Sequence, residues 1–71
     1  MYQIIPVQQR ILDFIKSEIE DKGYPPTIRE IQIEVGYNSP SSVHWHLNDL
    51  EKRGYIQREK RSPRALKVME G

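Results

Sequence analysis

The sequence predicts a mostly α-helical domain in which three helices are followed by a two-stranded antiparallel β-hairpin. Apolar residues recur every three or four positions up to Gly54, which is the period of an amphipathic helix. After Gly54 the period changes to two, as in a half-buried strand. A chain of 71 residues has room for one small domain with a thin core, so we expect residues 1–71 to form a single domain.

The first helix is predicted over residues 6–22. Pro6 suits the first helical turn, where its missing N–H removes no hydrogen bond. Gly23 favours the left-handed conformation that ends a helix, and the two prolines that follow soon after prevent continuation. The side chains expected to face the core are spaced four residues apart, with Leu12 beside them: Val7, Ile11, Ile15 and Ile19.

The second helix, predicted over residues 28–35, begins with a capping box. The hydroxyl of Thr27 can accept a hydrogen bond from the backbone N–H of Glu30, and the Glu30 carboxylate can accept one from the N–H of Thr27. Gly36 ends this helix. Its buried face is expected to consist of Ile28, Ile31 and Val35.

The third helix is predicted over residues 40–53. Ser39 is expected to cap its N-terminus through its side chain, with Pro40 as the first helical residue. Gly54 ends the helix after two basic residues, whose charges suit the C-terminal end of the helix dipole. Its apolar stripe is expected to be Val43, Leu47 and Leu50.

The hairpin is predicted over residues 55–68. Ile56 lies in the first strand, Leu66 and Val68 share one face of the second, and the polar segment 59–64 connects the strands. A two-stranded hairpin is only marginally stable in water, so we expect it to pack on the helices.

Three helices and a basic hairpin in this order are typical of a winged helix-turn-helix domain that binds DNA. A short turn containing Gly36 separates the second and third helices, as in the helix-turn-helix unit. The charge distribution agrees with a polyanionic partner. Residues 1–50 carry four basic and seven acidic side chains, a net charge of −3, whereas residues 51–71 carry seven basic and three acidic ones, a net charge of +4.

A helical wheel of the third helix separates a core face from an outward face. At about 100° per residue, Leu47 and Leu50 lie within about 40° of Val43. The opposite face and its flank carry hydroxyl, imidazole, indole, amide and ammonium groups, which suit base edges and phosphates. These residues are Ser41, His44, Trp45, Asn48 and Lys52.

Two of these features have alternative interpretations. Trp45 could be a partly covered surface residue, but a large exposed apolar ring favours a partner surface, either DNA or another protein. The basic hairpin tip could be a solvated turn, but its position beside the third helix favours binding to phosphates or to a narrow minor groove. The basic residues of the tip are Lys60, Arg61 and Arg64.

Other functional classes find little support in the sequence. His44 and His46 diverge by about 200° on a helix, so they cannot chelate one metal ion together, and His46 is expected to be partly buried. No nucleophile is paired with a base, so we expect no enzyme, and neither a metal nor a cofactor. No apolar run approaches the roughly 20 residues of a membrane span, and the absence of cysteine fits a reducing compartment. We therefore expect a cytoplasmic protein.

Five stretches of the chain match the pattern of one known family: residues 23–31 (GYPPTIREI), 35–37 (VGY), 39–47 (SPSSVHWHL), 50–56 (LEKRGYI) and 63–66 (PRAL). The run Gly-Tyr-Pro-Pro-Thr before the second helix is the most specific of them. From Ile11 to Val68, more than three quarters of its length, the chain resembles the N-terminal DNA-binding domain of the LexA family of bacterial SOS repressors.

The resemblance implies repression by two copies that occupy a palindromic DNA operator. LexA-like domains read bases from the start and outer face of the third helix, and their wing contacts the DNA backbone through basic residues. The matching base-reading positions are Ser39, Ser41, Ser42, His44 and Trp45, and the matching wing residues are Lys60, Arg61 and Arg64. We expect further DNA-backbone contacts from Arg29, Asn48 and Lys52. Trp45 is bulky where related sequences often carry a small or acidic residue, which leaves the operator sequence open.

The second half of LexA-like repressors is a self-cleaving serine-lysine peptidase domain that also drives dimerisation, and nothing in these residues can supply it. We expect either an excised DNA-binding domain or a short relative, such as a phage or mobile-element regulator with a different operator. Alone, the domain is expected to be monomeric or weakly dimeric. The alternative from another class is a winged-helix protein–protein interaction module that docks through the face around Trp45.

Overall fold

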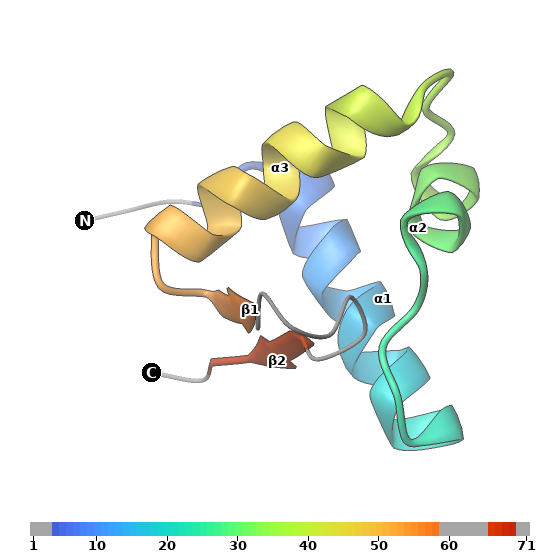
Figure 1. Cartoon of the computed structure of the whole chain (residues 1–71), viewed down its shortest axis with the longest axis vertical. Coiled ribbons are helices and arrows are strands. Elements are labelled where there is room, and N and C mark those ends of the chain that lie inside the picture. Colours follow the sequence, from blue (N-terminus) through green and yellow to red (C-terminus); the bar gives the residue numbers. More distant parts are fainter. Residues whose placement is uncertain (1–3, 59–65, 70–71) are drawn as a thin grey trace.

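The computed structural model describes residues 4–58 and 66–69 of the chain. It has the predicted mostly α-helical fold, a winged helix-turn-helix in which a two-stranded antiparallel hairpin follows three helices (Figure 1). The elements are α1 (Pro6–Lys22), α2 (Ile28–Val35), α3 (Pro40–Lys52), β1 (Ile56–Arg58) and β2 (Leu66–Val68).

The ends of α1 and α2 follow the local signals. Gly23 and Gly36 adopt φ angles of 84° and 75°, the left-handed region that glycine enters without steric cost. The capping box of α2 is complete. Thr27 Oγ1 accepts from the Glu30 N–H at 3.1 Å, and Glu30 Oε1 accepts from the Thr27 N–H at 2.8 Å.

The third helix differs from the prediction in two details. It ends at Lys52, one residue earlier than predicted, because Arg53 is the cap residue and the chain then turns through Gly54 at a φ of 84°. Ser39 stands at the N-cap position in extended conformation, but its side chain makes no capping hydrogen bond. The main local signal for the start of α3 is therefore Pro40, whose φ is fixed near the helical value, and not the Ser39 side chain.

The core lies where the three helices and β1 meet. The predicted positions Val7, Ile19, Ile28 and Val35 are only partly buried and pack against its edge. Among the described residues, Gln8 is the only one with a polar side chain that is buried in the core. The buried apolar residues are Ile11, Leu12, Ile15, Ile31, Val43, Leu47, Leu50 and Ile56.

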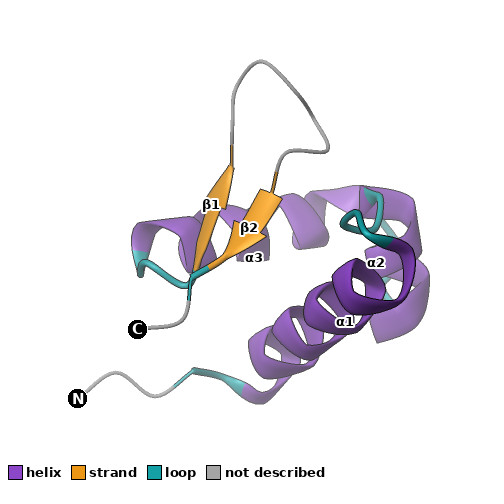
Figure 2. Ribbon diagram, turned by 90° about the horizontal axis from the view of Figure 1, so that it is seen from below, coloured by secondary structure: helices purple, strands orange, loops and turns teal. Residues whose placement is uncertain are grey.

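The hairpin packs on the helices, as expected for so small a sheet. Ile56 pairs with Val68 and Arg58 with Leu66, while β1 contacts α3 and β2 contacts α1 (Figure 2). The predicted wing residues Lys60, Arg61 and Arg64 lie outside the residues that the structure describes.

Candidate nucleic-acid interface

The turn between α2 and α3 is held by backbone and side-chain hydrogen bonds. The Tyr37 N–H donates to the carbonyl of Gln32 at 3.0 Å, and the Gln32 side-chain amide donates back to the Tyr37 carbonyl at 3.2 Å. Gly36 adopts the left-handed conformation of this turn without a steric clash, because it has no Cβ atom. These contacts hold the start of the turn that leads from α2 into α3.

The predicted division of α3 into two faces is present. Its buried side chains are Val43, Leu47 and Leu50. Trp45 keeps 61% of its surface exposed and meets the ring of His46 edge-on, with ring centroids 5.0 Å apart. Of the other predicted DNA-contact positions on this helix and its cap, only Ser42 is partly buried. The exposed ones are Ser39, Ser41, His44, Asn48 and Lys52.

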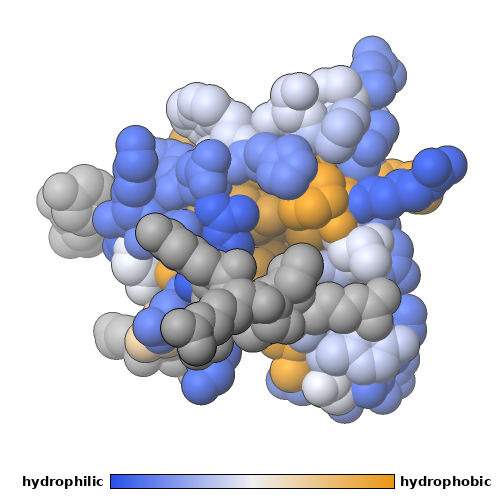
Figure 3. Space-filling model, viewed as in Figure 1, coloured by the Kyte–Doolittle hydropathy of each residue, from blue (hydrophilic) through white to orange (hydrophobic). Residues whose placement is uncertain are grey.

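One face of the molecule is largely hydrophilic along α3, with apolar residues reaching the surface between α3 and α2 (Figure 3). Arg29 is exposed on α2. The structure thus places the described candidate residues on two consecutive helices of one helix-turn-helix unit.

His46 is a structural residue, as the sequence indicated, and it lies in a polar network that joins α1, the turn and α3. Its Nδ1 lies 3.1 Å from the amide nitrogen of Gln8, and its Nε2 lies 2.9 Å from the hydroxyl of Tyr37. The rings of Tyr37 and His46 stack, with centroids 5.7 Å apart. The Gln8 amide nitrogen also donates to Asp49 Oδ2 at 2.8 Å.

The network fixes the tautomer of His46. The Asp49 carboxylate only accepts hydrogen bonds, so the Gln8 amide must turn its nitrogen toward it. That same nitrogen donates to His46 Nδ1, which leaves the ring proton on Nε2 to donate to the Tyr37 hydroxyl. A protonated His46 would place a second donor against the Gln8 amide.

The burial of His46 lowers the pKa of its imidazole, and the nearby Asp49 carboxylate offsets this only in part. The pKa of Asp49 is itself lowered, first by the hydrogen bond from Gln8 and further by Arg53. Both causes favour the ionised form of the Asp49 carboxylate.

The lowered pKa predicts that the domain loses stability in mild acid. The unfolded imidazole, with a usual pKa of about 6.5, binds a proton before the folded one does. The contribution of neutral His46 is thus fully present above about pH 6.5 and declines as the pH falls through the window below that value. Urea unfolding midpoints at pH 7.5, 6.5 and 5.5 measure this decline.

The His46→Gln variant should show a weaker decline over the same pH range, since it removes the titrating group. His44→Gln is the matched control, because His44 lies two residues away on the exposed face of the same helix. An equal decline in His46→Gln and in the unaltered chain would contradict the assignment to His46.

Asn48 has a partner that the sequence-based argument did not anticipate. Arg58 of β1 donates from Nη2 to the Asn48 side-chain oxygen and to Glu51 Oε1, the latter at 3.1 Å. The alternation of side chains along β1 could have indicated this contact. Arg58 is two residues from the buried Ile56 and so lies on the same side of the strand.

Gln8 was also missed, although the spacing could have revealed it. It precedes Ile11 by three residues and Leu12 by four, so it lies on the buried face of α1.

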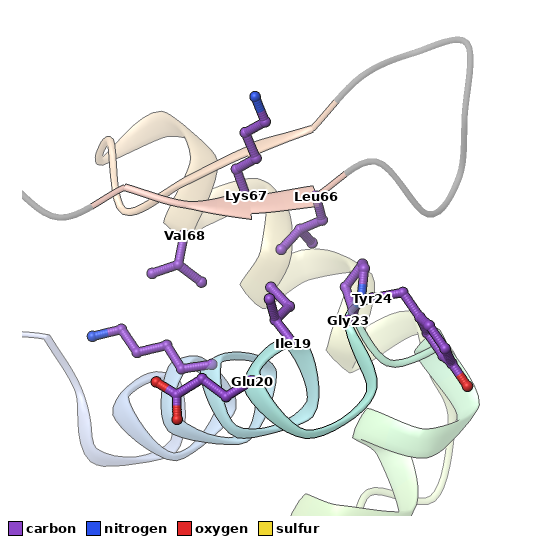
Figure 4. Close-up of a pocket in the computed structure, with 9 residues that line it drawn as sticks. Ile19, Glu20, Gly23, Tyr24, Leu66, Lys67 and Val68 are labelled. Atoms are coloured by element: carbon purple, nitrogen blue, oxygen red, sulfur yellow. The ribbon is translucent and has the colours of Figure 1, made fainter.

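The described residues form no cluster of metal ligands, and none of the predicted DNA-binding residues lines the groove that they form. None of the histidine and carboxylate side chains in residues 4–58 and 66–69 form a group of three that could hold a metal ion. A groove of about 400 Å³ lies between the end of α1 and β2, lined in part by Ile19, Tyr24 and Leu66 (Figure 4). It contains none of the residues predicted to bind DNA. Among the described helices, none is long and apolar enough to cross a membrane.

Comparison with known proteins agrees with the geometry. Residues 1–65 match the family model of the LexA DNA-binding domain. The chain is 58% identical over 62 residues to the LexA repressor of an Exiguobacterium species, covering 87% of this chain and 30% of that protein. It is 54% identical over 63 residues to LexA repressor of Oceanobacillus iheyensis, covering 89% and 30%.

A third relative, LexA repressor of Bacillus mycoides, is 49% identical over 69 residues, which cover 97% of this chain and 34% of that protein. The chain thus spans about a third of the length of these curated relatives. The family match over nearly the whole chain, together with the three helices and the hairpin, shows that the chain belongs to the LexA DNA-binding domain family.

Proposed function

We propose that this domain binds double-stranded DNA in a sequence-specific way by placing α3 in the major groove, as the operator-binding part of a LexA-type repressor. The observation that carries the proposal is the division of α3 into a buried apolar face and an exposed face of polar and aromatic groups. Membership of the LexA DNA-binding domain family supports the same function.

The base-reading residues of this proposal lie at the start and on the outer face of α3. Serine hydroxyls and the His44 imidazole can exchange hydrogen bonds with base edges, and the Trp45 ring can contact thymine methyl groups. The partly buried Ser42 contributes through the start of the helix, where it lies beside the exposed Ser41. The full set is Ser39, Ser41, Ser42, His44 and Trp45.

Backbone contacts set the register of α3 on the duplex. The Asn48 amide accepts from Arg58 through its oxygen, which leaves its nitrogen free to donate to a phosphate. The cationic wing residues follow β1 in the sequence, and we propose that they contact the phosphates of the DNA backbone. The proposed contacts are Arg29, Asn48, Lys52, Lys60, Arg61 and Arg64.

Two copies would bind the half-sites of a palindromic operator, about one helical turn apart, and so block transcription of SOS-type genes. The relatives named above are about three times as long as this chain. We expect the 71-residue domain on its own to bind as a monomer or weak dimer.

The proposal predicts that Trp45→Ala and His44→Ala weaken binding to the preferred sequence by about 1–3 kcal/mol each and weaken binding to random duplex DNA much less. The physical reason is that base contacts carry sequence preference, whereas phosphate contacts do not. Selection from a pool of random duplexes supplies the preferred sequence and the half-site spacing, and fluorescence anisotropy then measures both affinities.

The matched control is Ile33→Ala, which removes a large exposed apolar side chain from α2 instead of α3. Equal losses on preferred and random DNA would remove Trp45 and His44 from base reading. Failure of the unaltered chain to bind any duplex at low salt would favour the protein–protein interaction module instead.

A further inference from the structure

We propose that Arg58 is an additional phosphate contact of this interface, held in place for that role by Asn48 and Glu51. The proposal rests on DNA binding through α3 and adds a residue from β1 to the proposed set. Its evidence is a pair of side-chain contacts that join the hairpin to the rim of the exposed face of α3.

The guanidinium of Arg58 connects strand and helix. Its Nη2 donates to the Asn48 oxygen and, at 3.1 Å, to Glu51 Oε1, while Nε lies 3.4 Å from the same carboxylate oxygen. The side chain is only 29% exposed. Arg58 thus gives up side-chain freedom on folding, before any DNA is bound.

The bound guanidinium still has donors to offer. It carries five N–H groups, which point along different edges of the guanidinium plane. A carboxylate can therefore accept from one edge while a phosphate accepts from another. Among the described residues, no hydrogen-bond partner uses Nη1. Within the described part of the chain, its two N–H groups are therefore available to a phosphate without release of Asn48 or Glu51.

The position of the guanidinium suits a phosphate that borders the major groove. Asn48 follows His44 by four residues, so the two lie one turn apart on the same ridge of α3. Arg58 therefore lies beside the base-reading face and does not lie on it. A cation at this rim binds duplexes of any sequence and adds to the salt dependence of binding.

Arg53 provides a matched control within the same chain. Its Nε lies 3.1 Å from Asp49 Oδ2, and its side chain is 32% exposed, close to the value for Arg58. Arg53 is thus an arginine of similar exposure that is likewise paired with a carboxylate of α3. Arg53 follows Asn48 by five residues. At about 100° per residue, it therefore lies about 140° from Asn48 around the helix axis, away from the flank that Asn48 occupies.

The experiment measures the affinity of the 71-residue chain for a random duplex and for the selected duplex between 50 and 200 mM salt. For Arg58→Gln we expect the slope of log affinity against log salt to become shallower by about 0.9, one phosphate contact. The affinity ratio between the two salt concentrations then shrinks about threefold to fourfold on both duplexes. Arg58→Lys should keep the slope, and Arg53→Gln should behave as the unaltered chain does.

An unchanged slope in Arg58→Gln, with or without a loss of affinity, would make Arg58 a residue that only positions the hairpin and would overturn the proposal. So would an equal change of slope in Arg53→Gln, or a loss of slope in Arg58→Lys despite its retained charge. Circular dichroism confirms that each variant is folded. If the unaltered chain bound neither duplex, the proposed DNA-binding function would itself fail, which is a different result from an unchanged slope.

Discussion

Replacing Leu47 with alanine is expected to destabilise the domain by about 2–5 kcal/mol, a large part of the roughly 5–15 kcal/mol available to a folded domain. Leu47 is 1% exposed and packs in the core on the side of α3 opposite Trp45. The substitution leaves a cavity that a small, thin-cored domain can close only in part. Because the same helix carries the proposed base-reading residues, DNA binding should be lost together with the fold. Urea unfolding followed by circular dichroism measures the first effect and anisotropy the second.

Ile33→Ala is the control for this prediction. Ile33 is also a large aliphatic residue of the helix-turn-helix unit, but it is 70% exposed. Its removal should change the free energy of unfolding by no more than about 0.5 kcal/mol. Comparable losses at Ile33 and Leu47 would show that the packing beneath α3 does not determine the stability of the domain.

Affinity for random duplex DNA is expected to fall about 500-fold when salt rises from 50 to 200 mM. The estimate takes a slope of about 0.9 for each neutralised phosphate and the five cations of the proposed backbone set. Arg58 would make the fall steeper still. Displacement of counterions from DNA is the cause, so the effect does not depend on sequence. Anisotropy titrations with a labelled duplex, at four salt concentrations, measure it. The five cations are Arg29, Lys52, Lys60, Arg61 and Arg64.

The wing accounts for a defined share of this salt dependence. The double variant Lys60→Ala, Arg61→Ala should lower the slope by about 1.8. Lys22→Ala is the control, since Lys22 pairs with Glu18 at the C-terminal end of α1. That end of the helix lies away from α3 (Figure 1). An unchanged slope in the double variant would remove the wing from the DNA interface.

The hydrogen bond to Glu18 and the charge of that carboxylate raise the pKa of Lys22, so the Lys22 side chain of the unaltered chain is charged at neutral pH. Its removal therefore tests for a general effect of positive charge, as distinct from charge at the interface.

The sequence by itself determined the helices, because their signals act over a few residues, and the change of period to two predicted the hairpin. Thr27 and Glu30 are three residues apart and form their capping box wherever the chain starts a helix. Gly36 enters the left-handed region for a reason internal to its own backbone. The wheel of α3 also placed Trp45 outward, since one helix defines both of its faces. Local signals were less reliable at Ser39, where the expected side-chain cap did not form.

Only the tertiary structure decided which polar groups meet. Gln8 and His46 are 38 residues apart, and Gln8 and Asp49 are 41 apart. Arg58 reaches Asn48 across ten residues that include the end of α3 and the turn at Gly54. Helical periodicity relates positions three or four apart and says which face a side chain occupies. It does not say which face of another element lies opposite, because that depends on how the whole core packs.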